Sequence, residues 1–228
     1  TLLATVDPIL LAEIKKRKRG QLQTFAGTGS KGLVIDADSV TQALYNGFET
    51  ALAGGNLLGP DSSADFYFQK LLENESVKPL HGLMRRNLAV ALQDEVQQAL
   101  NALLANDPYE ANTWQYNPEK YSHYPDYLQR TIELLGEKHY MVPSLMSKKR
   151  YFEGYNISKT LVEHQKQPAL RDSLLEAAKK LYLQGIAFEP GAAYLYHAIG
   201  NLYITSTPLY TDSLLLWSKR SIELSPGW

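Results

Sequence analysis

Cysteine is absent from this chain of 228 residues. Its absence excludes disulfide bonds, thiol nucleophiles, and zinc or iron–sulfur sites built on cysteine. No uninterrupted apolar run approaches the roughly 20 residues that a membrane-spanning helix needs. Neither sign of charge dominates, because 23 Lys and Arg residues stand against 24 Asp and Glu residues, a net charge of −1. A general nucleic-acid-binding protein is normally more basic, so we expect no nucleic-acid partner.

Sequence patterns that carry catalysis are also scarce. No two histidines have the spacing of a His-Glu-x-x-His metal site, and no Gly-x-Ser-x-Gly nucleophile motif occurs. The stretch 27–32 (GTGSKG) departs from a phosphate-binding loop, in which Ser or Thr follows the lysine. We therefore predict a protein that is not an enzyme and that uses no metal or cofactor. One alternative stays open, a small-ligand enzyme that uses His123 and His139 with carboxylates of the 109–140 region.

The composition is that of a globular protein, with 44% hydrophobic and 21% charged residues. Charge is uneven along the chain. Residues 1–35 carry six basic and two acidic side chains, a net charge of +4, which leaves −5 for the remainder. We expect a basic helix near 8–19, a glycine-rich linker up to residue 35, and a helical domain over 36–228.

The basic run of the N-terminal helix has three interpretations. It can be the solvated end of a helix, where cations suit the helix dipole. It can also be a nuclear-import signal, or it can lie beside a membrane, since basic residues collect on the cytoplasmic side of spans. Proximity to a membrane therefore stays open beside a cytoplasmic location. The run consists of Lys15, Lys16, Arg17, Lys18 and Arg19.

Helical periodicity dominates from Asp38 onward. Apolar residues recur three and four positions apart, and strand-like alternation is rare. Asp61 or Ser62 is suited to cap the second helix, and Pro79 and Gly82 are expected to interrupt the chain. The pattern predicts an all-α protein built from antiparallel helix pairs. Its helices are expected near 38–54, 62–76, 83–105, 127–135, 144–160, 169–187, 192–205 and 211–224.

A repeat becomes visible towards the end of the chain. Pro190 and Pro226 each close a helix and lie 36 residues apart. Between them, Tyr196, Ile199-Gly200 and Tyr203 have the spacing of a first helix in a tetratricopeptide repeat. The preceding helix has the small and aromatic residues of a second helix, at Ala178, Tyr182 and Gly185. The chain thus resembles the tetratricopeptide repeat family, most clearly over residues 172–228.

The resemblance has limits along the chain. Leu214 and Ser221 stand where the family usually has small residues and alanine, and the link over 204–210 is about two residues longer than usual. Ala64, Phe68 and Leu71 repeat the second-helix spacing early in the chain. Residues 77–171 can be degenerate repeats or an insertion. The chain stops where another repeat would begin, so we expect a fragment of a longer protein.

The resemblance implies an α-α superhelix, a solenoid of helical repeats whose first helices line a concave, peptide-binding surface. In the last repeat the inward positions are Tyr194, His197, Asn201 and Thr205. An asparagine amide can donate to and accept from a peptide backbone at the same time, which suits Asn201 to this task. Because 192–205 contains no Lys or Arg, the clamp that some family members use for acidic C-termini is not expected.

A second candidate for partner binding is the aromatic segment 109–127. Tyr and Trp side chains provide rigid contact area at low entropic cost. The functional interpretation is a recognition loop that binds through Trp114, Tyr116 and Tyr121. In the alternative interpretation, the rings pack over adjacent helices and hold the segment down.

The leading functional hypothesis is a non-catalytic scaffold that binds a peptide or a partner domain through the repeats. The alternative is a regulatory or sensory segment of a larger bacterial multidomain enzyme, for example one with a peptidase or kinase domain.

Overall fold

The structure is a computed structural model that describes residues 38–105, 119, 121–164, 166–204 and 211–226. Within these ranges the chain forms α-helices and two short 3-10 helices, and no strand occurs. The prediction of an all-α protein is therefore confirmed for this part of the chain. The predicted helix near 8–19 and the glycine-rich linker lie outside it. The predicted helical domain contains two compact units, which divide after Leu92.

The first unit contains α2 (Ser39–Gly54), α3 (Ala64–Leu72), the 3-10 helix η1 (Glu75–Leu80) and the beginning of α4 (His81–Leu104). Asp38 caps α2, since its carboxylate accepts hydrogen bonds from the backbone N–H groups of Val40 and Thr41, both at 2.9 Å. The cap of α3 is Ser63, whose Oγ accepts from the N–H of Phe66 at 3.1 Å. The expectation that Asp61 or Ser62 caps α3 was therefore wrong.

The start of α4 also differs from the sequence prediction. Pro79 lies in η1, which continues directly into α4, and Gly82 lies in the first turn of α4. Pro79 therefore lies just before the start of α4, as expected of a residue that separates two helices, but Gly82 does not interrupt α4, which begins two residues earlier than predicted. The core of this unit is apolar and includes Phe48, Phe68 and Leu71.

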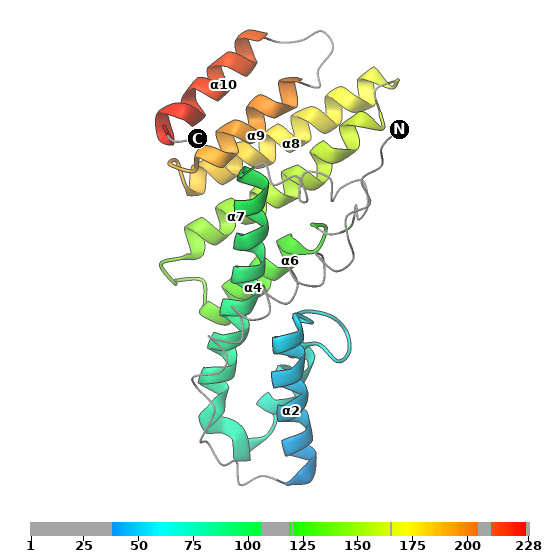
Figure 1. Cartoon of the computed structure of the whole chain (residues 1–228), viewed down its shortest axis with the longest axis vertical. Helices are drawn as coiled ribbons and strands as arrows, with labels where there is room; N and C mark the ends of the chain where they lie inside the picture. The colour runs from blue at the N-terminus through cyan, green and yellow to red at the C-terminus, as the bar shows by residue number, and fades with distance from the viewer. Residues whose placement is uncertain (1–37, 106–118, 120, 165, 205–210, 227–228) are drawn as a thin grey trace, which may run out of the picture. The chain divides into compact units, whose positions relative to one another are not determined.

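The second unit contains the rest of α4, followed by α6 (Tyr124–Leu135), α7 (Val142–Ser158), η2 (Lys159–Val162), α8 (Pro168–Phe188), α9 (Ala193–Ile204) and α10 (Thr211–Leu224). From α6 onward each helix packs against the next one in the chain, as Figure 1 shows for α7 to α10. In addition, α7 contacts α9. The helices α7 to α10 match their predicted ranges to within two residues.

Two helix pairs, α7–α8 and α9–α10, pack through equivalent contacts. Gly154 of α7 lies under the ring of Tyr182, where an added Cβ would come within 2.5 Å of Cε1. Gly200 of α9 lies under Ser218 of α10, where an added Cβ would be 3.2 Å from Oγ. The two glycines are 46 positions apart, and the two residues above them are 36 positions apart.

A second contact between the paired helices also recurs, again 46 positions later in the first helix and 36 positions later in the second. The backbone of Gly185 in α8 lies close to the carbonyl oxygen of Ser147 in α7, 3.2 Å from an added Cβ. At the equivalent place, the Oγ of Ser221 in α10 donates to the carbonyl oxygen of Ala193 in α9 at 3.0 Å. The two pairs therefore share one packing geometry. The stretch from Gly154 to Tyr182 is ten residues longer than the stretch from Gly200 to Ser218. The connection in the first pair, which contains η2, is three residues longer, and α8 begins seven residues earlier relative to the equivalent contact.

Candidate functional site

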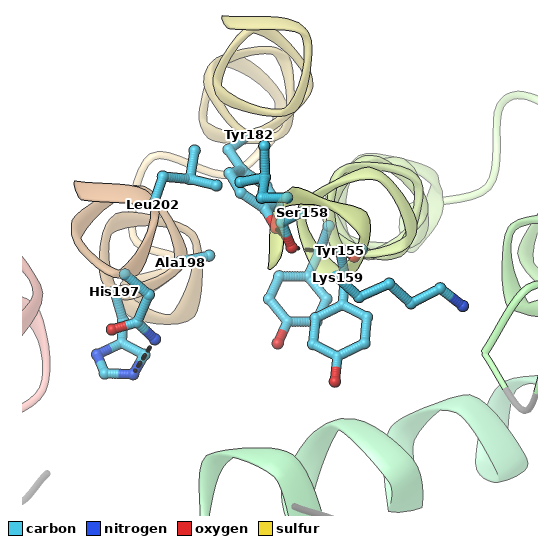
Figure 2. A pocket seen from close by; sticks show the side chains of 10 residues that line it. Tyr155, Ser158, Lys159, Tyr182, His197, Ala198 and Leu202 are labelled. Carbon is cyan, nitrogen blue, oxygen red and sulfur yellow. Dashed lines mark hydrogen bonds between the residues drawn. The ribbon is translucent and has the colours of Figure 1, made fainter. Parts of the chain in front are cut away.

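A cavity of about 250 Å³ opens between α7 and α9, and Tyr182 of α8 also lines it (Figure 2). These two helices are the first members of the two equivalent pairs. The volume lies below the range of about 300–1,000 Å³ that is typical of pockets for whole small molecules. A cavity of this size is suited to part of a ligand, such as one side chain of a bound peptide.

One wall of the cavity is made of tyrosines on α7. Tyr151 and Tyr155 lie one turn apart, and their rings stack with centroids 6.1 Å apart. The ring of Tyr151 is supported by Tyr182 at 6.0 Å and by the perpendicular ring of Tyr194 at 5.4 Å. Burial raises the pKa of Tyr151 well above its ordinary value, so its phenol stays protonated and can donate. This wall is therefore aromatic, rigid and uncharged.

The end of α7 is fixed by a short chain of hydroxyl groups. Tyr182 donates to the Oγ of Ser158 at 3.4 Å, and Ser158 donates to the carbonyl oxygen of Tyr155 at 3.0 Å. Burial raises the pKa of Tyr182 as well. Because Gly154 has no side chain, the ring of Tyr182 can lie directly on α7 and close the back of the cavity.

The opposite wall belongs to α9 and is polar. His197 and Asn201 lie one turn apart, and the Nδ2 of Asn201 is 3.0 Å from the Nε2 of His197 (Figure 2). Burial lowers the pKa of His197, which favours the neutral ring with Nε2 as an acceptor. Asn201 then donates one amide hydrogen to His197. The other amide hydrogen and the oxygen Oδ1 remain available to a ligand.

Little charge lies at this site. Lys159 is the one charged residue among the described residues that line the cavity, and Figure 2 shows its ammonium group pointing away from His197. No carboxylate is among the described residues that line it. The cavity therefore offers aromatic faces and hydrogen-bond donors. Its described residues offer no negative charge that would neutralise a buried cation.

The structure brings three of the sequence-predicted residues to this side of the second unit. His197 and Asn201 line the cavity. Tyr194 lies one layer behind it, where its hydroxyl hydrogen-bonds the Oγ of Ser147 at 2.8 Å. Thr205, Trp114 and Tyr116 lie outside the described residues.

Tyr121 lies elsewhere in the second unit. Its side chain is only 1% exposed, and its ring packs against Tyr124, Phe152 and Tyr155 at centroid distances of 5.5, 6.1 and 5.4 Å. The carbonyl oxygen of Tyr121 accepts from the side chain of Asn156 at 3.1 Å. The contacts of Tyr121 are those of a core residue that supports Tyr155 from behind.

Sequence reasoning missed the α7 half of the site. When Gly154 is aligned with Gly200, Tyr151 takes the place of His197, and Tyr155 takes the place of Asn201. The cavity thus lies between equivalent pairs of residues on two first helices. The glycine in α7 was the available signal, but the longer connection before α8 obscured the register.

The histidines considered for catalysis have other contacts. The ring of His123 packs against Tyr124 and Tyr127, and burial lowers its pKa. The Nδ1 of His139 accepts from the N–H of Met141 at 3.4 Å. Among the described residues, no group of three or more potential metal ligands is found.

Comparisons with known proteins found no relative. No protein-family model matches the chain. No curated protein and no solved structure matches it either. Within the described ranges, none of the helices combines the length and the apolar character needed to cross a bilayer.

Proposed function

We propose that this chain is a tetratricopeptide-like helical repeat protein that binds an extended peptide of a partner protein and performs no chemistry of its own. The repeated packing of α7–α8 and α9–α10 supports the repeat interpretation. The same contacts recur with offsets of 46 and 36 positions, and they involve the motif residues Tyr182, Gly185 and Gly200. The resemblance of residues 172–228 to the family gives the same register.

The observation that carries the binding proposal is the position of the cavity. It lies between two first helices, and in tetratricopeptide repeats these helices line the peptide-binding surface. Tyr151 and Tyr155 from one helix and His197 and Asn201 from the next line it at equivalent positions. A solenoid that presents one peptide residue to each repeat would use positions of this kind.

The chemistry of the walls suits a peptide. The Asn201 amide keeps one donor and one acceptor, which match the C=O and N–H of a single peptide unit. The tyrosines supply apolar contact area with a fixed shape. The small volume accommodates one anchoring side chain, while the rest of the peptide lies along α7 and α9.

A peptide selection tests this proposal. Phage carrying random peptides would be selected on the immobilised protein, and the best peptides synthesised and measured by fluorescence anisotropy. We expect the Asn201→Ala variant to bind them about thirtyfold more weakly, since one peptide unit loses two hydrogen bonds of about 1 kcal/mol each. The matched control is Lys180→Ala, on the exposed side of α8. Equal affinities for wild type and Asn201→Ala would contradict the proposed site, and a selection that yields no binder would contradict the function.

A further inference from the structure

The hydroxyl group of Tyr151 is a hydrogen-bond donor at the cavity. The residue is 6% exposed and lines the cavity, and no hydrogen bond joins its hydroxyl to another described residue. The hydroxyl does not belong to the fully buried side-chain atoms that lack a partner, so it is accessible from the cavity. A ligand that enters the cavity can therefore supply its acceptor.

The hydrogen-bond donors and acceptors of the walls limit the kinds of ligand that fit the cavity. Tyr151 offers an O–H group, and Asn201 offers an N–H group that His197 does not use. The acceptor Oδ1 of Asn201 belongs to an exposed residue, so it can bind water where a ligand has no N–H group for it. Carboxylates, the strong acceptors of proteins, do not line the cavity within the described ranges. A ligand with many N–H donors would leave those donors unpaired, which is costly away from water. The walls therefore favour a ligand that is rich in acceptors and poor in donors.

We propose that the cavity binds a proline-rich, extended segment of the partner protein. This inference rests on the proposed function. Proline lacks the backbone N–H but keeps the carbonyl, so a run of prolines presents acceptors alone. The polyproline II conformation has no internal hydrogen bonds, and aromatic-lined grooves are its usual binding sites. One proline ring lies against Tyr151 and Tyr155, and the Tyr151 hydroxyl and the Asn201 amide donate to carbonyl oxygens of the segment.

The charge of the cavity-lining helix adds a second criterion. Over residues 142–162, α7 and η2 carry Lys148, Lys149, Arg150 and Lys159 against Glu153, a net charge of +3. Lys149 and Arg150 pair with Glu153, and the charge of Glu189, just after α8, acts on Lys148, which leaves a net charge of +2 for these residues together. A segment with flanking Lys or Arg would meet this charge unfavourably, whereas flanking acidic residues would be attracted to it. The expected occupant is a proline run that is followed by acidic residues.

The test uses synthetic peptides and the whole chain. The probe is a fluorescein-labelled octaproline followed by two glutamates. Its controls carry alanine at alternate prolines or lysines in place of the glutamates. We expect the probe to bind at least about tenfold more tightly than the alanine peptide, and the lysine peptide to bind more weakly than the probe at low salt.

Two variants assign the binding to the cavity. Tyr151→Phe keeps the ring and removes the hydroxyl, and it should weaken binding of the probe about threefold to tenfold, the effect of one hydrogen bond. The exposed Asn201 provides a second variant, Asn201→Ala, with a loss of the same order. The matched control is Tyr140→Phe, since Tyr140 is 84% exposed. Circular dichroism and thermal unfolding verify that each variant is folded.

The outcomes separate this inference from the proposed function. If the probe binds no more tightly than the alanine peptide, while library-selected peptides bind and depend on Asn201, the proline inference is wrong and the proposed function stands. If no peptide of any composition binds, both are wrong. If the probe binds the folded Tyr151→Phe and Asn201→Ala variants as tightly as wild type, the cavity is not the site.

Discussion

The phenol ring of Tyr182 lies directly on the backbone of Gly154, where an added Cβ would come within 2.5 Å of the ring. Tyr182 is 1% exposed, and its hydroxyl donates to the Oγ of Ser158 at 3.4 Å, so the ring is held in this position. The contact joins α8 to α7 and forms the back of the cavity. In the first unit, Gly47 has the same relationship to Tyr67, at 2.6 Å. In both units, therefore, a glycine in one helix lets a tyrosine of the next helix pack directly on its backbone.

Substitution of Gly154 by alanine should destabilise the second unit. Overpacking of a well-filled core costs about 1–3 kcal/mol. Alanine regains up to about 1 kcal/mol through its higher helix propensity. We therefore expect a net loss of about 1–2 kcal/mol in the free energy of unfolding, measured by urea denaturation of wild type and Gly154→Ala side by side.

Gly82 provides the control for this substitution. It also lies in a helix, but an added Cβ would meet nothing within 4 Å. Gly82→Ala should be neutral or should stabilise by up to about 1 kcal/mol, because only the helix propensity changes. If Gly154→Ala behaves like Gly82→Ala, the close approach of α7 and α8 is not present in solution.

The bond between Ser221 and the carbonyl of Ala193 should contribute measurably to the packing of α10 on α9. Ser221 is 2% exposed, and its Oγ donates at 3.0 Å. Ser221→Ala removes one buried hydrogen bond and should cost about 0.5–1.5 kcal/mol. The readout is the thermal unfolding midpoint, with Ser173→Ala on the exposed face of α8 as the control. A variant as stable as wild type would show that tight packing alone, as at Gly185, holds this contact.

Much of the fold follows from sequence periodicity, and the errors have identifiable causes. The last helices were predicted closely because apolar spacing and the closing proline Pro190 agree there. The cap of α3 was missed because 61–63 are three adjacent polar residues, each able to cap. Ser63 has the extended backbone of a helix cap, and its hydroxyl also donates to the carbonyl of Gly59 at 2.9 Å, whereas Ser62 has a positive φ of 56°. Local sequence carries no signal for such a choice.

The candidate site was predictable in part for a similar reason. His197 and Asn201 follow from the repeat motif, since that motif defines the inward face of α9. Tyr151 and Tyr155 lie on α7, and the stretch from α7 to its contact on α8 is ten residues longer than the equivalent stretch from α9 to α10, so a search at fixed spacing does not align them. Only the contact of Gly154 with Tyr182 restores the register.

Tyr194 should be a structural residue, although its sequence position suggested contact with a partner. Its hydroxyl pairs with Ser147, which is fully buried, and its ring packs against Tyr151. Tyr194→Phe keeps the ring and should lower the stability by about 0.5–1.5 kcal/mol. We expect peptide affinity at pH 7 to change by less than about twofold. A larger loss of affinity in a variant of wild-type stability would instead place the Tyr194 hydroxyl at the ligand.

Stability and peptide binding should both depend on the protonation of His197. Burial lowers the pKa of this residue from its ordinary value of 6.5 in the folded protein, so the unfolded chain takes up the proton first. The free energy of unfolding is therefore highest above pH 6.5. It decreases as the pH falls from 6.5 through the pKa of His197 in the folded protein. Protonation also turns Nε2 into a donor, which breaks the hydrogen bond from Asn201. Affinity for a peptide should therefore fall at acidic pH.

The variant His197→Gln isolates this effect. A glutamine can accept from Asn201 through its side-chain oxygen, but it does not titrate, so the variant should bind at pH 7 and lose the decrease at low pH. His123 needs a parallel variant, His123→Gln, because burial lowers its pKa in the same direction. We expect His123→Gln to reduce the pH dependence of stability and to leave that of peptide affinity unchanged. The measurements are anisotropy titrations from pH 5 to pH 8 and urea denaturation over the same range. If His197→Gln retains the full pH dependence of affinity, the orientation of Asn201 does not depend on a neutral His197, and the polar wall of the cavity acts through another group.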